Sequence, residues 1–139
     1  MANQHILIVE DREPLLSLLR TVLEEEQYAV SAYREGTEAL RAIVAEPPDL
    51  VILDLRLTDM PGRDILEMLR DHAEGGAIAH IPVIVATAAT LEADTLSQVI
   101  ARNPARYANV SVLQKPFELD ELLLRVRQAL GEPADAQAD

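Results

Sequence analysis

Four short apolar runs divide this chain, and each of them stops at a polar residue. The runs cover residues 5–9, 50–53, 82–86 and 110–114. Apolar runs of four or five residues without alternation are typical of strands that are buried on both faces of a parallel sheet. A more mixed segment at residues 28–32 predicts one further strand. The pattern therefore predicts five strands.

The segments between these runs have the three- and four-residue spacing of amphipathic helices. In residues 14–27, leucine and valine recur at this spacing, and Pro14 suits the first turn of a helix. Thr37 is the predicted cap of a helix that continues through Glu46. Three more helices are predicted at residues 63–72, 91–102 and 118–130, and the segment 73–80, which contains two adjacent glycines, is predicted to be a loop.

Strands that alternate with helices predict an α/β fold, a three-layer α/β/α sandwich with right-handed crossovers. If the acids after the first and third strands are to meet, these strands must be neighbours. The five-stranded parallel sheet then has the order 2-1-3-4-5, which is flavodoxin-like, and the acids lie at its topological switch point. One domain is expected over residues 1–130, and the Pro-, Ala- and Asp-rich tail at 131–139 is expected to be disordered.

Composition limits what such a domain can bind. The 139 residues fit one domain, and 24 acidic against 12 basic residues give a net charge of −12, which opposes contact with nucleic acid or anionic lipid. The chain contains no cysteine, so it has neither a disulfide nor a thiolate metal site. No secretory signal and no apolar stretch of about 18 residues is found, and we expect a cytoplasmic protein that does not contact a membrane.

The polar residues at the strand ends predict a site for metal and phosphate. Three carboxylates, from Glu10, Asp11 and Asp54, would repel one another by roughly 3 kcal/mol per pair at about 5 Å and an effective dielectric constant near 20. Lys115 would offset one of them, and Mg²⁺ suits the remaining oxygen ligands. An aspartate can also act as a nucleophile toward a phosphoryl group, with a lysine and a hydroxyl such as that of Thr87 holding its oxygens.

In these positions the chain resembles the receiver domain of two-component response regulators. The resemblance covers about residues 4 to 130, and its motifs occur in the order of the family. They are Glu10-Asp11, Asp54 with Met60-Pro61-Gly62 in the following loop, Thr87-Ala88, and Lys115-Pro116-Phe117.

This resemblance implies a magnesium-dependent phosphoacceptor. Asp54 would accept a phosphoryl group from a histidine kinase or a phosphotransfer protein. Glu10, Asp11, Asp54 and the backbone carbonyl of Arg56 would bind Mg²⁺. The domain would take part only in its own phosphorylation and dephosphorylation, and would not be an enzyme in any further sense.

The resemblance also implies the groups that respond to phosphorylation. Thr87, Ala88 and Lys115 would contact the phosphoryl group, and the peptide bond between Lys115 and Pro116 would be cis. The fourth helix, fifth strand and fifth helix would form the face that binds a downstream protein or a second copy of the chain.

Several positions depart from the usual receiver pattern. Val112 occupies the position of the aromatic residue three places before the lysine, and Tyr107 is near but not in register. Thr58 replaces the usual proline in the loop after Asp54. Arg56 is long and cationic, and we expect it to tune the lifetime of the acyl phosphate.

Two other functions remain open from the sequence. The missing aromatic residue is compatible with a receiver-like module that binds proteins independently of phosphorylation. A Mg²⁺-dependent phosphatase with an aspartyl-phosphate intermediate would use similar chemistry, but one large group of these enzymes carries a second acid two residues after the nucleophile, where this chain has Arg56.

Overall fold

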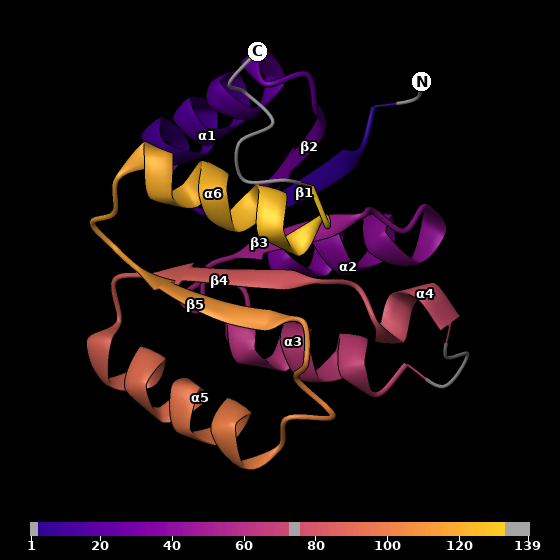
Figure 1. The fold of residues 1–139 in the computed structure, drawn as a ribbon, viewed down its shortest axis with the longest axis vertical. Helices are drawn as coiled ribbons and strands as arrows, with labels where there is room; N and C mark the ends of the chain where they lie inside the picture. Colours follow the sequence, from indigo (N-terminus) through magenta and orange to yellow (C-terminus); the bar gives the residue numbers. More distant parts are fainter. Residues whose placement is uncertain (1–2, 73–75, 133–139) are drawn as a thin grey trace.

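The computed structural model describes residues 3–72 and 76–132, and these contain five strands and six helices (Figure 1). The strands are β1 His5–Val9, β2 Ala29–Tyr33, β3 Leu50–Leu53, β4 Val83–Thr87 and β5 Val110–Gln114. The helices are α1 Glu13–Glu25, α2 Gly36–Ala45, α3 Gly62–Arg70, α4 Gly76–Ala79, α5 Thr90–Arg102 and α6 Leu119–Ala129. None of the helices in the described ranges is long and apolar enough to cross a bilayer.

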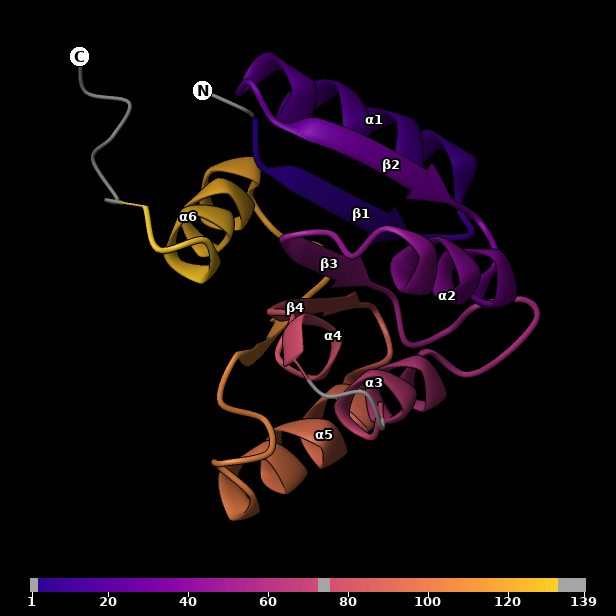
Figure 2. The same ribbon diagram turned by 90° about the vertical axis from the view of Figure 1, so that its right-hand side faces the viewer.

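All five strands form one parallel sheet in the order β2-β1-β3-β4-β5, which confirms the predicted fold class. Helices cover both faces of this sheet (Figure 2). Side chains of α1 and α6 share one apolar core with one face of the sheet, and side chains of α2, α3 and α5 share the other. The result is a three-layer α/β/α sandwich.

The register of the strands aligns their carboxyl ends. Val9 of β1 pairs with Leu53 of β3, and Thr87 of β4 pairs with Gln114 of β5. Strands β3 and β4 are buried along their whole length, as their uninterrupted apolar sequences predict. The residues that follow the strands therefore emerge at one edge of the sheet.

Residues 73–75 of the predicted loop at 73–80 lie outside the described residues, and the described part contains a helix. Gly76–Ala79 form the short helix α4, and Ile78 is buried in the core. Arg70 holds this segment by donating hydrogen bonds to the backbone oxygens of Ala79 at 3.0 Å and Ile81 at 2.7 Å. The glycines led to the prediction of a loop, whereas the described residues form a short helix that contacts the last residue of α3.

The expected tail at 131–139 lies mostly outside the described residues. The two residues that are described are in contact with the domain. Glu132 donates its backbone N–H to the oxygen of Arg127 at 2.8 Å, and its carboxylate accepts a hydrogen bond of 2.8 Å from the hydroxyl of Tyr28.

Helix α2 is not capped by the side chain of Thr37, contrary to the sequence prediction. The cap position is Glu35, whose side chain makes no capping hydrogen bond. The carboxylate of Asp59, in the β3–α3 loop, instead accepts hydrogen bonds from the backbone N–H groups of Gly36 at 2.8 Å and Thr37 at 2.9 Å, and from the Thr37 hydroxyl at 2.6 Å. The loop that follows Asp54 is thereby fixed to the N-terminus of α2.

The same loop turns back on the end of β3 at Gly62. The N–H of Gly62 donates a 2.7 Å hydrogen bond to the oxygen of Leu55. A Cβ atom at Gly62 would lie 2.0 Å from the backbone oxygen of Asp54. Only glycine fits where the backbone of α3 approaches the end of β3 this closely.

We predict that Gly62→Ala destabilises the fold by about 3 kcal/mol or more, because backbone atoms cannot move aside as side chains can. Gly36→Ala is the control. The three atoms nearest to its Cβ would belong to the flexible side chains of Ile65 and Met60, not to the backbone. Urea unfolding compares the two variants, and equal losses would contradict the close approach at Gly62.

We also predict a low pKa for Asp59. Its hydrogen bonds from Thr37 and Gly36 lower its pKa from 3.8 to about 2. Between these two values the unfolded chain binds more protons than the folded one. This contribution to stability is therefore present above about pH 3.8 and is lost as the pH falls through about 2.

Titration of the Asp59 carboxyl carbon by NMR measures this directly. A midpoint well below that of a model carboxyl is expected, and Asp59→Ala is expected to speed hydrogen exchange at the amides of Gly36 and Thr37. A midpoint at or above 3.8 would show that the carboxylate does not cap α2 in solution.

Candidate functional site

Three acidic residues meet at the carboxyl edge of the sheet. One oxygen from each of Glu10, Asp11 and Asp54 lies within 4.8 Å of the others. Glu10 follows β1 and is 2% exposed, Asp54 follows β3 and is 7% exposed, and Asp11 is partly buried. The neighbouring positions of β1 and β3 bring these acids together, as the sequence predicts.

Lys115 supplies a positive charge to this cluster. Its Nζ donates hydrogen bonds to Glu10 Oε1 at 2.6 Å and to Asp54 Oδ2 at 3.0 Å. Burial raises the pKa of Glu10 above its ordinary value, the nearby charge of Asp54 adds to this rise, and the bond from Lys115 opposes it. The cluster contains three carboxyl groups and one ammonium group, and such a set of oxygens suits a divalent cation.

The end of β4 positions Lys115. The N–H of Lys115 donates to the oxygen of Thr87 at 2.8 Å, and the Lys115–Pro116 peptide bond is cis. Thr87 is fully buried, and its hydroxyl oxygen accepts a 3.2 Å hydrogen bond from the N–H of Ala89. Ala88, between them, is exposed beside Lys115 and Pro116 in a hollow of about 390 Å³.

Arg56 contacts the site through its backbone, while its side chain is directed elsewhere. Its N–H donates a 3.1 Å hydrogen bond to Asp54 Oδ1. Its guanidinium contacts Glu92, in the first turn of α5, through two bonds, Nε to Oε2 at 3.0 Å and Nη2 to Oε1 at 3.2 Å. The sequence had singled out Arg56 but gave no sign of this partner.

Thr58 also contacts the acidic cluster. Its hydroxyl donates a 3.2 Å hydrogen bond to Asp11 Oδ2. Asp11 is held from its other side, because the guanidinium of Arg34 donates two bonds, at 3.3 Å and 3.2 Å, to its backbone oxygen. The threonine that replaces the usual proline therefore orients one of the candidate metal ligands.

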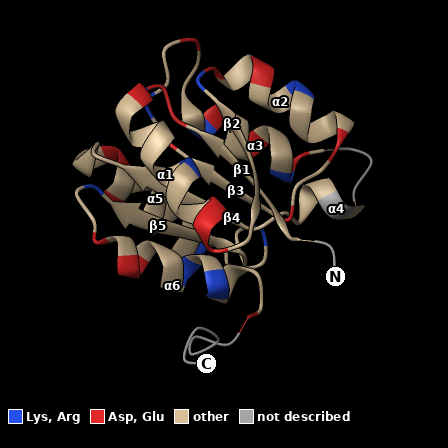
Figure 3. Cartoon of the chain, turned by 90° about the horizontal axis from the view of Figure 1, so that it is seen from above, with Lys and Arg blue, Asp and Glu red and all other residues tan. Residues whose placement is uncertain are grey.

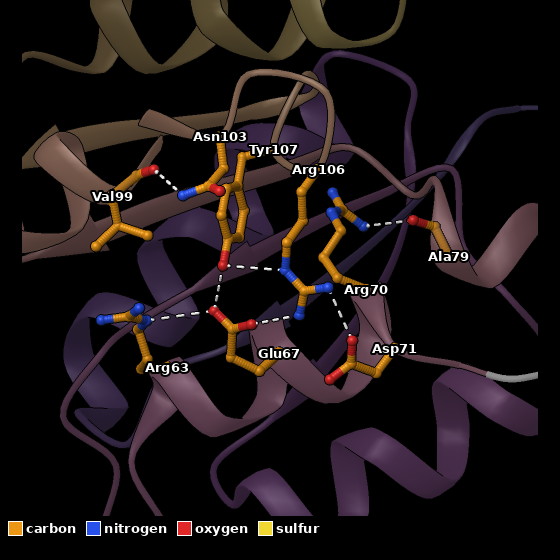
Figure 4. A network of polar contacts seen from close by, with 9 residues as sticks. All are labelled: Arg63, Glu67, Arg70, Asp71, Ala79, Val99, Asn103, Arg106 and Tyr107. Atoms are coloured by element: carbon orange, nitrogen blue, oxygen red, sulfur yellow. Dashed lines mark hydrogen bonds and ion pairs between the residues drawn. The ribbon is translucent and has the colours of Figure 1, made fainter. Parts of the chain in front are cut away.

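Tyr107 lies buried near the start of β5, away from the acidic cluster. Its hydroxyl donates to Glu67 of α3 at 2.6 Å and accepts from Arg106 at 3.1 Å, and Arg106 also contacts Asp71 at 2.8 Å (Figure 4). Val112, at the usual aromatic position, packs against the core that contains Tyr107. Tyr107 therefore fixes the segment between α5 and β5 to α3.

Charged residues of both signs are interspersed on the surface. Both α2 and α6 carry acidic and basic residues in the view from above, and on α6 the acids lie toward the first turn and the arginines toward the last (Figure 3). Several of them form ion pairs one helical turn apart, such as Arg125 with Glu121 at 3.4 Å. In the part of the chain that the structure describes, three or more acidic, histidine or cysteine side chains that could hold a metal ion together occur in the acidic cluster at the strand ends.

Known proteins are similar to this chain in sequence and in fold. The family model for the response regulator receiver domain matches residues 6–127. The DNA-binding response regulator MtrA of Mycolicibacterium paratuberculosis is 35% identical over 137 residues, which make up 99% of this chain and 56% of MtrA. The chain spans about half the length of the curated relatives it matches.

Solved structures agree with the sequence match. A putative response regulator from Chloroflexus aurantiacus has a TM-score of 0.77 and 29% identity, covering 94% of this chain and 100% of that one. The receiver domain of the sensor histidine kinase PA1611 from Pseudomonas aeruginosa has a TM-score of 0.75 and 25% identity over 94% of this chain and 100% of its own, and that structure holds a magnesium ion in its active site cleft. With its acidic cluster at the predicted edge of the sheet, the chain belongs to the response regulator receiver domains of two-component signal transduction.

Proposed function

We propose that Asp54 is the phosphoacceptor of this receiver domain. The observation that supports this most directly is the position of its carboxylate. One oxygen accepts from Lys115 Nζ and the other from the N–H of Arg56, and two further acids lie beside it. These donors orient the carboxylate and neutralise part of the charge that gathers when a phosphoryl group arrives.

The transfer is a displacement at phosphorus. A carboxylate oxygen of Asp54 attacks the phosphorus of a phosphohistidine on a kinase or phosphotransfer protein. An O–P bond forms while the P–N bond breaks. The electron pair of the P–N bond returns to the imidazole nitrogen, which takes up a proton. The signal ends by hydrolysis of the acyl phosphate. Water attacks the phosphorus, the acyl O–P bond breaks, and its electron pair returns to the carboxylate.

Glu10, Asp11, Asp54 and the backbone carbonyl of Arg56 are the groups that would hold Mg²⁺. The acidic cluster fits this ion, because its three carboxylates, within 4.8 Å of one another, carry more charge than the one lysine, which contacts two of them. Bound there, Mg²⁺ supplies positive charge to the oxygens of the transferring phosphoryl group. The magnesium in the PA1611 receiver supports the same assignment.

Thr87, Ala88 and Lys115 are the groups that would respond to the phosphoryl group. Lys115 already contacts Asp54, and it would retain a phosphoryl oxygen as a partner. The Thr87 hydroxyl lies at the end of the neighbouring strand β4, and it is proposed to donate to another of these oxygens. The movement of Thr87 toward the phosphoryl group would alter the packing of α5, which begins at Thr90.

The partners follow from the domain type. The donor is a sensor histidine kinase or a phosphotransfer protein, and the exchange takes place in the cytoplasm. The face that binds a downstream protein or a second copy of the chain consists of α5, β5 and α6, which are the fourth predicted helix, the fifth strand and the fifth predicted helix. The net charge of −12 argues against direct contact with nucleic acid. The domain acts on its own phosphoryl group and has no external substrate.

We predict that this protein, incubated with Mg²⁺ and acetyl phosphate, gains one phosphoryl group that is visible by intact mass. Asp54→Asn is expected to abolish the adduct. Asp64→Asn, at an exposed aspartate on α3, is the matched control and is expected to keep it. Retention of the adduct in Asp54→Asn would overturn the assignment.

The same experiment separates the two rival functions. An unmodified parent protein that still binds Mg²⁺ would favour a module that works independently of phosphorylation. Repeated turnover of an external phosphate ester such as p-nitrophenyl phosphate would favour a phosphatase.

We also predict that Mg²⁺ stabilises the folded domain. At ten times its dissociation constant, the ion should raise the free energy of unfolding by about 1.4 kcal/mol, because the unfolded chain lacks the gathered carboxylates. Thermal unfolding with and without Mg²⁺ measures the effect. Asp11→Asn is expected to lose most of it, and Asp64→Asn to retain it; an equal response in both variants would place the ion elsewhere.

A further inference from the structure

The single residue Arg56 contacts both Asp54, the proposed phosphoacceptor, and helix α5. Its backbone N–H donates to Asp54 Oδ1 at 3.1 Å. Its guanidinium donates to both carboxylate oxygens of Glu92, at 3.0 Å and 3.2 Å. The Glu92 carboxylate therefore holds the guanidinium of a residue that lies two positions after the proposed site of phosphorylation.

The ion pair spans a hollow between the β3–α3 loop and the first half of α5. This hollow has a volume of about 840 Å³, and Leu57 and Met60 line it from the loop while Leu91 and Thr95 line it from the helix. Leu91 is 78% exposed, so this end of α5 is not packed closely against the loop. Among the described residues, the Arg56–Glu92 ion pair is the salt bridge that joins the β3–α3 loop to α5.

The other end of α5 is held more firmly. The segment after the helix is fixed to α3 through Tyr107 and Arg106, whose side chains both reach Glu67 (Figure 4). At the N-terminal end, apart from the ion pair, the Ala89 N–H contacts Thr87 and the Gln114 amide contacts Thr90. Movement of α5 would therefore be greatest at its first turn, where Glu92 lies.

A phosphoryl group on Asp54 would compete with Glu92 for Arg56. The added group carries about −1.5 to −2 charges, and guanidinium binds phosphate oxygens in the same two-bond geometry that it uses with carboxylate. The side chains of Arg56 and Glu92 are 72% and 49% exposed, so their pairing is weak enough for a nearby anion to redistribute it.

We propose that Glu92 is a positioning residue of the switch, and that phosphorylation transfers Arg56 from Glu92 to the phosphoryl oxygens. The transfer frees the first turn of α5 from the loop. Glu92 thereby opposes phosphorylation, and its release carries the signal to the face that α5 presents to partners. This inference rests on the proposed function, because it requires a phosphoryl group at Asp54.

Beryllofluoride with Mg²⁺ tests the competition, because it mimics the phosphoryl group without a covalent step. Its dissociation constant is measured by calorimetry for the parent, Glu92→Gln, Arg56→Ala and the double variant. We expect Glu92→Gln to bind the mimic about two- to fivefold more tightly than the parent, the range that exposed ion pairs give. In the Arg56→Ala background, Glu92→Gln should have no effect.

Asp94→Asn is the matched control, since it removes one negative charge from an exposed position on the same helix. It is expected to leave the affinity near that of the parent. An equal gain in Asp94→Asn and Glu92→Gln, or a gain that persists in the Arg56→Ala background, would overturn the proposal and indicate general electrostatics.

Amide spectra supply a second measurement, whose result would not change if Glu92 had a purely structural role. In Glu92→Gln without the mimic, the amides of residues 90–93 should shift part of the way toward their positions in the beryllofluoride-bound parent. Unmoved amides would contradict release of the first turn. Failure of the proposed function is distinct, because the parent itself would then neither bind beryllofluoride nor gain the Asp54 adduct.

Discussion

The contact between the ammonium group of Lys115 and the carboxylates of Glu10 and Asp54 is the interaction on which this site depends. These buried acids follow neighbouring strands and would repel each other without a counter-charge. Lys115 reaches both, and its backbone is fixed to Thr87. The charge that remains after this pairing, with that of the partly buried Asp11, is the basis of the affinity that we propose for a cation and hence for a phosphoryl group.

The loop after β3 connects this charged site to the helices around it. Its backbone contacts Asp54, its Asp59 caps α2, and its Arg56 reaches Glu92 on α5. The close approach of Gly62 to the end of β3 keeps the loop short and fixes where α3 starts. A change of charge at Asp54, as we propose, would therefore act on contacts that already join three helices to the site.

Much of the fold and of the acidic cluster could be predicted, because buried parallel strands are continuous apolar runs and their carboxyl ends share one edge. The contacts between loops and helices could not. Asp59 caps α2 from a position 22 residues beyond Thr37, and Glu92 pairs with a residue 36 positions earlier, so no local pattern marks either. Order at residues 76–79 was hidden by adjacent glycines, although Ile78 is apolar and buried.

Paramagnetic broadening by Mn²⁺, an ion that uses the same oxygen ligands as Mg²⁺, tests the central claim most directly. At substoichiometric Mn²⁺, the amide signals of Glu10, Asp11, Asp54 and Lys115 should broaden together, and excess Mg²⁺ should restore them. Signals near Tyr107, at the other edge of the sheet, should stay sharp. Broadening confined to one of the four residues, or spread evenly over the exposed acids of the surface, would contradict a single site built from three strand ends.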